Sequence, residues 1–292
     1  MDLDLKSVHV LITGAAGGIG LETTRLFLGK VSTLPGLTYP RCEEQGALVT
    51  AHYRSSDASL LPLLETYGSK QLRLAQAELT SEDQVNALFG QNLDEDPFGS
   101  VEVIVVNHGA HAPTAVPVKD MSLAQWEHCV NSNLTSTFLV VREYLNALEN
   151  VIQSKKVGSR FGDRASVVFV GSTAGKFGEA GFADYASNKS GMMYGLALSL
   201  KNEIVKIAPR GRVNTVAPGW TRTPLSADRL KDTAKVNRVL ATIPLRKVAT
   251  TEDIASQIVL LASAKVSGHV SGQVLMVDGG MEGRLLNLPE DL

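Results

Sequence analysis

Short apolar runs recur along the chain and alternate with amphipathic stretches. The runs are almost continuously hydrophobic, which is typical of parallel strands that are covered on both faces. The predicted strands are residues 8–12, 47–53, 72–76, 101–106, 166–170, 212–217 and 274–277. Stretches with helical periodicity, among them residues 81–89, 123–148 and 184–207, lie between the runs. The alternation predicts an α/β fold with a doubly wound, Rossmann-like parallel sheet.

Two segments interrupt this alternation. Residues 30–45 contain two prolines and make the link between the first helix and the second strand longer than usual, so we expect a surface insertion there. Residues 155–164 are polar and basic, which predicts a solvated loop rather than a binding patch. No Gly/Ser-rich or Pro-rich linker divides the chain, so residues 1–292 are expected to form a single domain.

The charge balance narrows the choice of partners. The net charge is −2 with acids and bases mixed along the chain, so no field recruits nucleic acid or an anionic membrane. No apolar run approaches the ~20 residues that cross a bilayer, and the acidic start is unlike a secretory signal. Cys42 and Cys129 form no CxxC pattern, although a pair between them stays open. We expect a cytoplasmic protein with reduced thiols.

A glycine-rich turn with the sequence TGAAGGIG directly follows the first predicted strand. Small residues let the backbone approach a pyrophosphate, and the N-terminus of the following helix stabilises its negative charge. Gly14, Gly18, Ile19 and Gly20 are therefore predicted to bind a dinucleotide. The glycine spacing fits two known patterns of such turns, TGxxxGxG with Gly18 and TGxxGxxG with Gly17. The turn alone does not decide which pattern applies.

Tyr185 and Lys189 are four residues apart in a predicted helix, so both side chains project from one face. The pair is weak evidence by itself, because such spacings arise by chance. A phenol has a pKa near ~10, and a neighbouring ammonium favours its ionised form only in a desolvated site. Ser172 follows the predicted strand at 166–170, where its hydroxyl can hold a substrate oxygen beside Tyr185. A hydrolase nucleophile is the rival interpretation, but the G-x-S-x-G elbow is missing.

Further segments match the same pattern. Asn133 lies in the predicted helix at 123–148, a PGWTRT segment follows the sixth strand, and VDGG comes at residues 277–280. With these features the chain resembles the short-chain dehydrogenase/reductase family from residue 13 to residue 280. The spacing from Ser172 to Tyr185 and the C-terminal ending favour the compact branch of that family over the extended, epimerase-like branch.

The resemblance implies a role for each polar residue. Tyr185 would exchange a proton with the substrate oxygen, and Ser172 would orient the carbonyl. Lys189 would hold the nicotinamide ribose and lower the pKa of Tyr185. Asn133 would support a water relay, although an amide in a helix can also simply satisfy a neighbouring backbone group. Beyond these and the turn, the expected cofactor-binding residues are Arg54, Asn107, Pro218, Gly219 and Thr223.

One departure from the family pattern follows the fourth predicted strand. The family usually has NNAG there, whereas this chain has NHGA, so Asn107 is kept and His108 replaces the second asparagine. His108 and His111 lack a convincing third ligand, so packing or solvent exposure is expected for both and no metal is assigned.

The end of the second predicted strand bears on cofactor choice. An acid at this position binds the ribose 2′-OH, whereas an arginine accommodates a 2′-phosphate. Here Tyr53 takes the place of the acid and Arg54 follows it, so NADP(H) is favoured over NAD(H), with a solvated Arg54 as the alternative. We predict an NADP(H)-dependent ketoreductase or alcohol dehydrogenase; an NAD-linked dehydrogenase or a non-catalytic nucleotide sensor are the competing hypotheses.

Substrate and assembly are less defined. Residues 220–240 resemble the family's substrate lid, and their apolar side chains indicate only a partly hydrophobic small-molecule carbonyl or alcohol. The resemblance also implies a homodimer or homotetramer assembled through long helices equivalent to residues 123–148 and 184–207.

Overall fold

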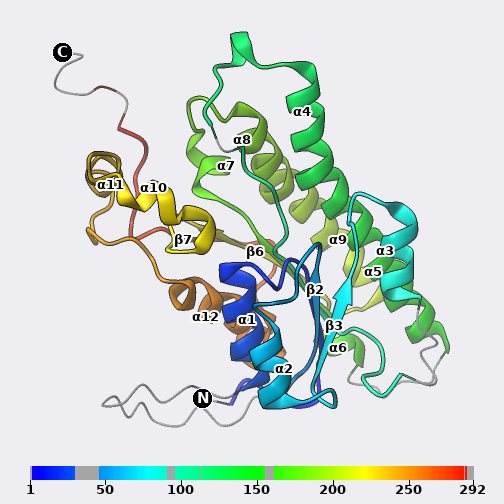
Figure 1. Cartoon of the computed structure of the whole chain (residues 1–292). Helices are drawn as coiled ribbons and strands as arrows, with labels where there is room; N and C mark the ends of the chain where they lie inside the picture. Colours follow the sequence, from blue (N-terminus) through cyan, green and yellow to red (C-terminus); the bar gives the residue numbers. More distant parts are fainter. Residues whose placement is uncertain are drawn as a thin grey trace, which may run out of the picture.

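A seven-stranded parallel sheet forms the centre of the protein (Figure 1). The computed structural model describes residues 2–29, 46–90, 96–112, 114–154, 161–285 and 287. The strand order is β3-β2-β1-β4-β5-β6-β7, and every neighbouring pair is parallel. The strands are β1 (His9–Ile12), β2 (Leu48–Tyr53), β3 (Leu72–Gln76), β4 (Val103–Val106), β5 (Ser166–Val170), β6 (Arg212–Pro218) and β7 (Val274–Val277). The predicted doubly wound α/β fold is confirmed, and all seven predicted strands are present.

Helices connect consecutive strands and continue beyond the sixth. They are α1 (Gly18–Leu28), α2 (Leu61–Tyr67), α3 (Glu82–Phe89), α4 (Leu123–Val130), α5 (Ser136–Ser154), α6 (Phe161–Arg164), α7 (Thr173–Phe177), α8 (Ala183–Ser190), α9 (Ala197–Ile207), α10 (Ala227–Lys231), α11 (Thr233–Leu240), α12 (Thr251–Ala262) and α13 (Ala264–Ser267). The prediction of a loop at 155–164 is wrong for its last four residues, because Phe161–Arg164 forms α6. The rest of that segment and the predicted insertion at 30–45 lie outside the described residues.

Two of the predicted helices are interrupted by wider turns. The prediction at 123–148 corresponds to α4 and α5, joined by a π-helical turn at Asn131–Thr135. The prediction at 184–207 corresponds to α8 and α9, joined by a second π-helical turn at Gly191–Leu196. Periodicity alone does not reveal such turns, since each inserts a single extra residue into an otherwise regular pattern.

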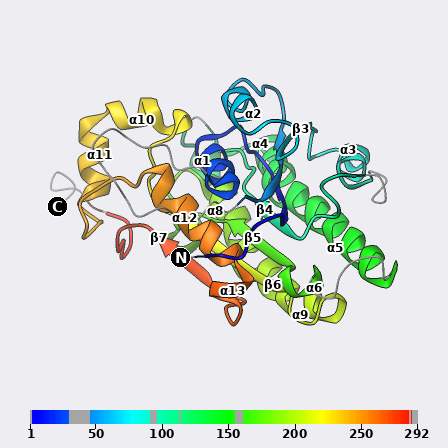
Figure 2. The same cartoon turned by 90° about the horizontal axis from the view of Figure 1, so that it is seen from below.

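Two hydrophobic cores lie on opposite faces of the sheet (Figure 2). Successive strand residues point to opposite faces, so Val10 and Ile12 enter the core under α1 and α12, whereas Leu11 enters the other. The second core is closed by α5 and α9, which bury the Tyr144 and Leu200 side chains. Double coverage explains why the strands read as continuous apolar runs.

The strand order reverses between β1 and β4, which is where an open α/β sheet forms its ligand crevice. The turn after β1 and the loop after β4 therefore meet at the same edge of the sheet. In the described part of the chain, no helix combines the length and apolar character that crossing a bilayer requires.

Candidate active site

The glycine turn leads from β1 into α1 at the switch point. Gly14 has φ +62°, a conformation that side chains with a Cβ rarely adopt. A Cβ on Gly20 would lie 2.3 Å from the Gly14 carbonyl oxygen, and one on Gly18 would lie 2.9 Å from Thr223 Cβ. Gly17 caps α1 without a side chain, so the first N–H groups of the helix stay open to a ligand. The turn thus fits the phosphates of a dinucleotide, with Ile19 in the first turn of the helix.

Asn107 fixes the conformation of this turn. Its Nδ2 donates to the carbonyl oxygens of Thr13 and Gly14 at 3.1 and 3.0 Å. Its backbone N–H donates to Thr13 Oγ1 at 3.0 Å. The retained asparagine is therefore a brace between the loop after β4 and the glycine turn.

His108, which stands where the family usually has a second asparagine, is also built into this brace. Its Nδ1 lies 2.8 Å from Thr13 Oγ1, and its Nε2 lies 3.0 Å from Ser136 Oγ on α5. Burial lowers the pKa of His108 to about 3, so the ring is neutral at physiological pH. Among the described residues, no three His, Cys, Asp or Glu side chains are grouped as metal ligands. His108 thus links α5 to the glycine turn.

His52 on β2 is a contributor that the sequence patterns did not single out. The Gly14 N–H donates to His52 Nδ1 at 3.0 Å, so Nδ1 is the acceptor and the proton is on Nε2. Nε2 donates to the Ala77 carbonyl oxygen at 2.9 Å. The His52 carbonyl oxygen also accepts from Ala15 N at 2.8 Å. A polar histidine near the end of an otherwise apolar strand was the only signal in the sequence, and it does not identify Gly14 as the partner.

Ser172, Tyr185 and Lys189 come together at the carboxyl end of β5. Ser172 caps α7, its Oγ accepting from Ala174 N at 3.1 Å, and its side chain lies close enough to Tyr185 to affect the pKa of the phenol. Lys189 is 5% exposed, its Nζ donates to the Val170 carbonyl oxygen at 2.9 Å, and Nζ lies 5.8 Å from the Tyr185 ring centroid. The three predicted side chains are therefore neighbours.

Burial controls the charges in this group. It raises the pKa of Tyr185 to about 12, and the neighbouring Ser172 side chain acts in the opposite direction without cancelling this shift. Burial also lowers the pKa of Lys189 to about 8, because an ammonium loses hydration there. The sequence predicts a lowered pKa for Tyr185, but the protein's own groups shift it upward. The phenol is thus protonated at neutral pH.

Asn133 lies in the π-helical turn between α4 and α5 and is 3% exposed. Its Oδ1 accepts from Ala110 N, and its Nδ2 donates to the carbonyl oxygens of Ala110 and Cys129, each at 3.0 Å. A Cβ on Gly109 would lie 2.8 Å from Asn133 Oδ1 and 3.5 Å from Lys189 Nζ. Asn133 therefore holds the loop after β4 against the lysine.

The PGWTRT segment closes the crevice on the side of β6. Pro218 ends β6, and Gly219 follows so closely against β7 that a Cβ would lie 3.0 Å from Asp278. Thr223 begins the 3₁₀ helix Pro224–Ser226 with a reciprocal capping box. Thr223 also lies against Gly18, which brings this end of the segment to the glycine turn.

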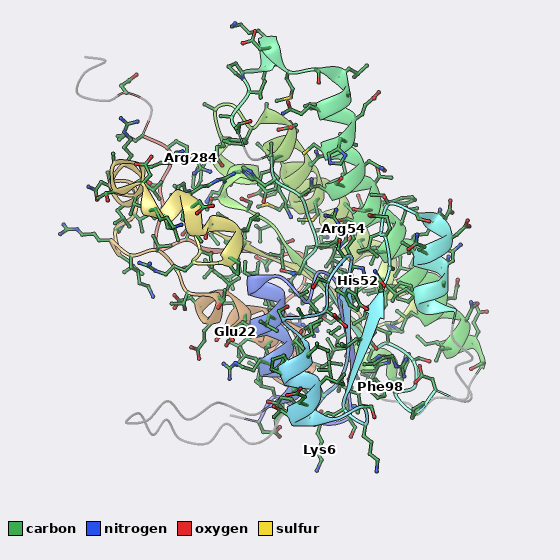
Figure 3. All side chains as sticks on the ribbon, in the orientation of Figure 1. Lys6, Glu22, His52, Arg54, Phe98 and Arg284 are labelled. Carbon is green, nitrogen blue, oxygen red and sulfur yellow. The ribbon has the colours of Figure 1, made fainter. Side chains whose placement is uncertain are left out.

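Arg54 lies at the far end of the crevice. It is exposed just after β2, beyond His52 (Figure 3), in a hollow that Gln76, Glu78 and Gln84 also line. Gln76 Nε2 donates to the Arg54 carbonyl oxygen at 3.0 Å. Glu78 was not singled out from the sequence, since it follows the third strand rather than the second.

Together, the sheet and glycine turn define a dinucleotide-binding α/β protein. A family model described as enoyl-(acyl carrier protein) reductase matches residues 39–282. The chain is 31% identical over 282 residues to nodulation protein G of Rhizobium sp. (strain N33), covering 95% of this chain and 98% of that protein. It is 29% identical over 282 residues to 3beta-hydroxysteroid dehydrogenase 1 of Eggerthella lenta, covering 95% of each.

Among solved structures, a short-chain glucose/ribitol dehydrogenase from Brucella melitensis superposes with a TM-score of 0.76 at 25% identity, covering 96% of this chain and 98% of that one. The chain belongs to the short-chain dehydrogenase/reductase family, as its sequence predicted. It is accordingly an oxidoreductase acting on CH–OH or C=O groups, of a family that uses NAD(P)(H).

Proposed function

We propose that this protein is an NADP(H)-dependent ketoreductase or alcohol dehydrogenase in which Tyr185 is the general acid or base. The observation that carries the proposal is the group of Ser172, Tyr185 and Lys189 at the carboxyl end of β5. That group lies on the same edge of the sheet as a glycine turn shaped for phosphates. Few other reactions require both features in one crevice.

In carbonyl reduction, Tyr185 donates its proton to the substrate oxygen while Ser172 holds that oxygen in place. A pKa of about 12 keeps the phenol protonated at neutral pH, which is the form that reduction requires. Lys189, anchored by the Val170 carbonyl oxygen, holds the ribose end of the cofactor. A bound nicotinamide supplies the hydride and, when oxidised, a positive charge that favours the phenolate needed for alcohol oxidation. The protonated phenol is therefore ready for the reduction direction, and oxidation would rely on the charge of the bound cofactor.

We propose two roles for Asn133, positioning of a loop and support of a water relay. Its contacts with Ala110 support a positioning role for the loop beside Lys189. The water relay to solvent rests on the family resemblance. Gly109 lies between Asn133 and Lys189 and is close to both side chains.

NADP(H) is the proposed cofactor because Arg54 offers an exposed guanidinium at the end of β2, where a 2′-phosphate would lie. The second candidate is NAD(H), which the Glu78 carboxylate in the same hollow favours, since a carboxylate repels a phosphate. Direct titration of both cofactors separates the two.

Residues 220–240 are proposed as the substrate lid. In the structure they comprise the 3₁₀ helix, α10 and α11, and Leu225 is 79% exposed. We also propose a homodimer or homotetramer, supported by exposed apolar side chains such as Phe138 on α5 and Val205 on α9. Light scattering on purified protein tests the assembly.

The reaction is tested by following nicotinamide absorbance across a panel of ketones, aldehydes and secondary alcohols with each cofactor. We expect turnover with NADPH and at least one carbonyl. Tight NADPH binding without turnover on the whole panel would instead support the nucleotide sensor.

A further inference from the structure

His111 and Arg229 border the Tyr185 side chain and have no part in the proton transfer proposed above. His111 lies in the loop after β4, and its ring centroid is 4.6 Å from that of Tyr185 and 4.5 Å from that of Phe182. Arg229 comes from α10, yellow in Figure 1, within the segment proposed as the lid. Its Nη2 lies 3.0 Å from His111 Nδ1 and donates to the Ala112 carbonyl oxygen at 3.0 Å. Only the imidazole ring separates the guanidinium from the tyrosine.

The guanidinium is held in a defined orientation. Besides the two contacts through Nη2, Arg229 Cζ lies 5.6 Å from the Phe182 ring centroid, within the range of a cation–π interaction. Burial lowers the pKa of His111, against the opposing hydrogen bond to the Ala112 carbonyl oxygen, and the Arg229 charge lowers it further, so the ring is neutral at physiological pH. A neutral imidazole adds no positive charge to the site. Arg229 is therefore an oriented, partly buried cation that contacts the ring packed on Tyr185.

This cation has no carboxylate partner in the described part of the chain. Glu179, whose charge reaches both Tyr185 and His111, is instead paired with Arg284 at 3.4 Å. Figure 3 labels Arg284, which also donates from Nε to the Gly178 carbonyl oxygen at 3.0 Å. Half-buried guanidinium groups are stabilised when an anion completes their hydrogen bonds, and a carboxylate matches the guanidinium fork best.

We propose that Arg229 binds a carboxylate of the substrate, so that the protein acts on oxo acids or on the corresponding hydroxy acids. The inference rests on the proposed reaction at Tyr185, because it places the carbonyl there and the carboxylate at the neighbouring guanidinium. Phe182 and His111 form the apolar wall between the two groups. His111 is a positioning residue: its Nδ1 lies 2.7 Å from the Ala112 carbonyl oxygen that also accepts from Arg229, so its ring helps to hold the loop against which the guanidinium lies.

The test compares each oxo acid with its own methyl ester. The probes are 2-oxobutanoate, 4-oxopentanoate and 4-acetylbenzoate, whose carbonyl-to-carboxylate separations differ. For at least one pair we expect wild type to have a higher kcat/KM on the acid. Arg229→Gln should lower kcat/KM on that acid by roughly 10- to 100-fold, the range for loss of a charge-assisted hydrogen bond, and leave the ester within threefold.

Two further variants and one control test whether the Arg229 guanidinium causes the preference for the acid. Arg229→Lys keeps the charge without the fork and should recover part of the acid preference. His111→Phe keeps the ring packing but loses the contact through Nδ1, so it should reduce that preference by a smaller factor. Arg210→Gln removes the same group from an exposed position after α9, away from the site, and should leave kcat/KM on both substrates unchanged. Melting temperatures of all variants establish that they are folded.

Three results would overturn the inference. Wild type could prefer the ester in every pair, Arg229→Gln could slow acid and ester equally, or it could weaken NADPH binding by the same factor as turnover. The last result would assign Arg229 to the cofactor. Turnover of esters without acid preference refutes only the carboxylate site, whereas no turnover of any acid or ester, together with no turnover on the general panel, refutes the reaction itself.

Discussion

The two ends of the crevice differ in how firmly the protein holds their charged groups. At the reacting end, Lys189 is 5% exposed and bonded to the Val170 carbonyl oxygen, and Tyr185 contacts both Ser172 and His111. At the other end, Arg54 is exposed, and no hydrogen bond of its side chain is found among the described residues. Charges interact strongly in a desolvated site, whereas water and salt screen an exposed charge. The structure therefore constrains the reaction class more tightly than the choice of cofactor.

The largest expected effect is at the buried end. Tyr185→Phe removes the hydroxyl that is proposed to donate the proton, so kcat should fall by roughly 10²- to 10⁴-fold, the usual contribution of a general acid. The NADPH dissociation constant should stay within about twofold. Initial rates and a fluorescence titration measure the two quantities, with Tyr194→Phe, an exposed tyrosine, as the control. Near-wild-type rates in Tyr185→Phe would refute the assignment.

The glycine turn between the two ends should respond next most strongly. Alanine at Gly20 would place its Cβ 2.3 Å from the Gly14 carbonyl oxygen, which forces the turn to move. We expect roughly tenfold weaker NADPH binding or more, together with a lower melting temperature, as overpacking costs about 1–3 kcal/mol. Gly195→Ala is the matched control, because its Cβ meets no atom within 4 Å. Equal NADPH affinity in Gly20→Ala and wild type would contradict this account of the turn.

Cofactor choice at the exposed end should be easier to alter. Arg54→Ala should weaken NADPH binding by about tenfold, since a hydrogen bond to a charged group contributes about 1.5–3 kcal/mol and solvent screens part of it. NADH binding should change by less than twofold. Arg210→Ala, an exposed arginine outside the crevice, controls for net charge. Tighter binding of NADH than of NADPH by wild type would exclude the assignment to NADP(H).

The smallest expected effect near neutral pH is on folding stability, through the buried histidines His9 and His108. Burial lowers the pKa of His9 to about 4 and that of His108 to about 3, whereas unfolded histidine titrates near 6.5. Between those values the unfolded chain binds more protons, so stability is complete above about pH 6.5 and declines as the pH falls toward 4.

Urea unfolding at pH 7.5, 6 and 5 measures this decline. His108→Asn should reduce its slope by up to about 1.4 kcal/mol per pH unit, while His269→Asn, which alters an exposed ring, should leave the slope unchanged. A slope that is the same in His108→Asn and wild type would show that His108 is not neutral in the folded protein.

Local patterns were sufficient for most of the fold. Each strand is covered on both faces, so it appears in the sequence as an apolar run, and all seven were found. The glycine turn and the Tyr185–Lys189 spacing were also visible, because each lies within one or two helical turns of sequence. The π-helical turn that contains Asn133 was missed, since it disturbs the periodicity too little.

Contacts between distant segments were beyond sequence reasoning. His52 accepts a hydrogen bond from the Gly14 N–H across 38 positions, and Arg229 meets His111 across 118. Neither histidine belongs to a spacing pattern, and a histidine in a strand or loop is compatible with many environments. Only the strand order and the course of α10 bring these pairs together.

The sequence by itself determined the order of strands and helices, the glycine turn proposed to bind phosphate, and the residues of the Ser172, Tyr185 and Lys189 group. These features depend on residue type and short spacing, which the chain displays directly. The tertiary structure decided the direction of the Tyr185 pKa and the place of the Arg229 cation beside it. Both depend on burial and on neighbours from distant segments, because desolvation and charge proximity arise only when the chain is folded.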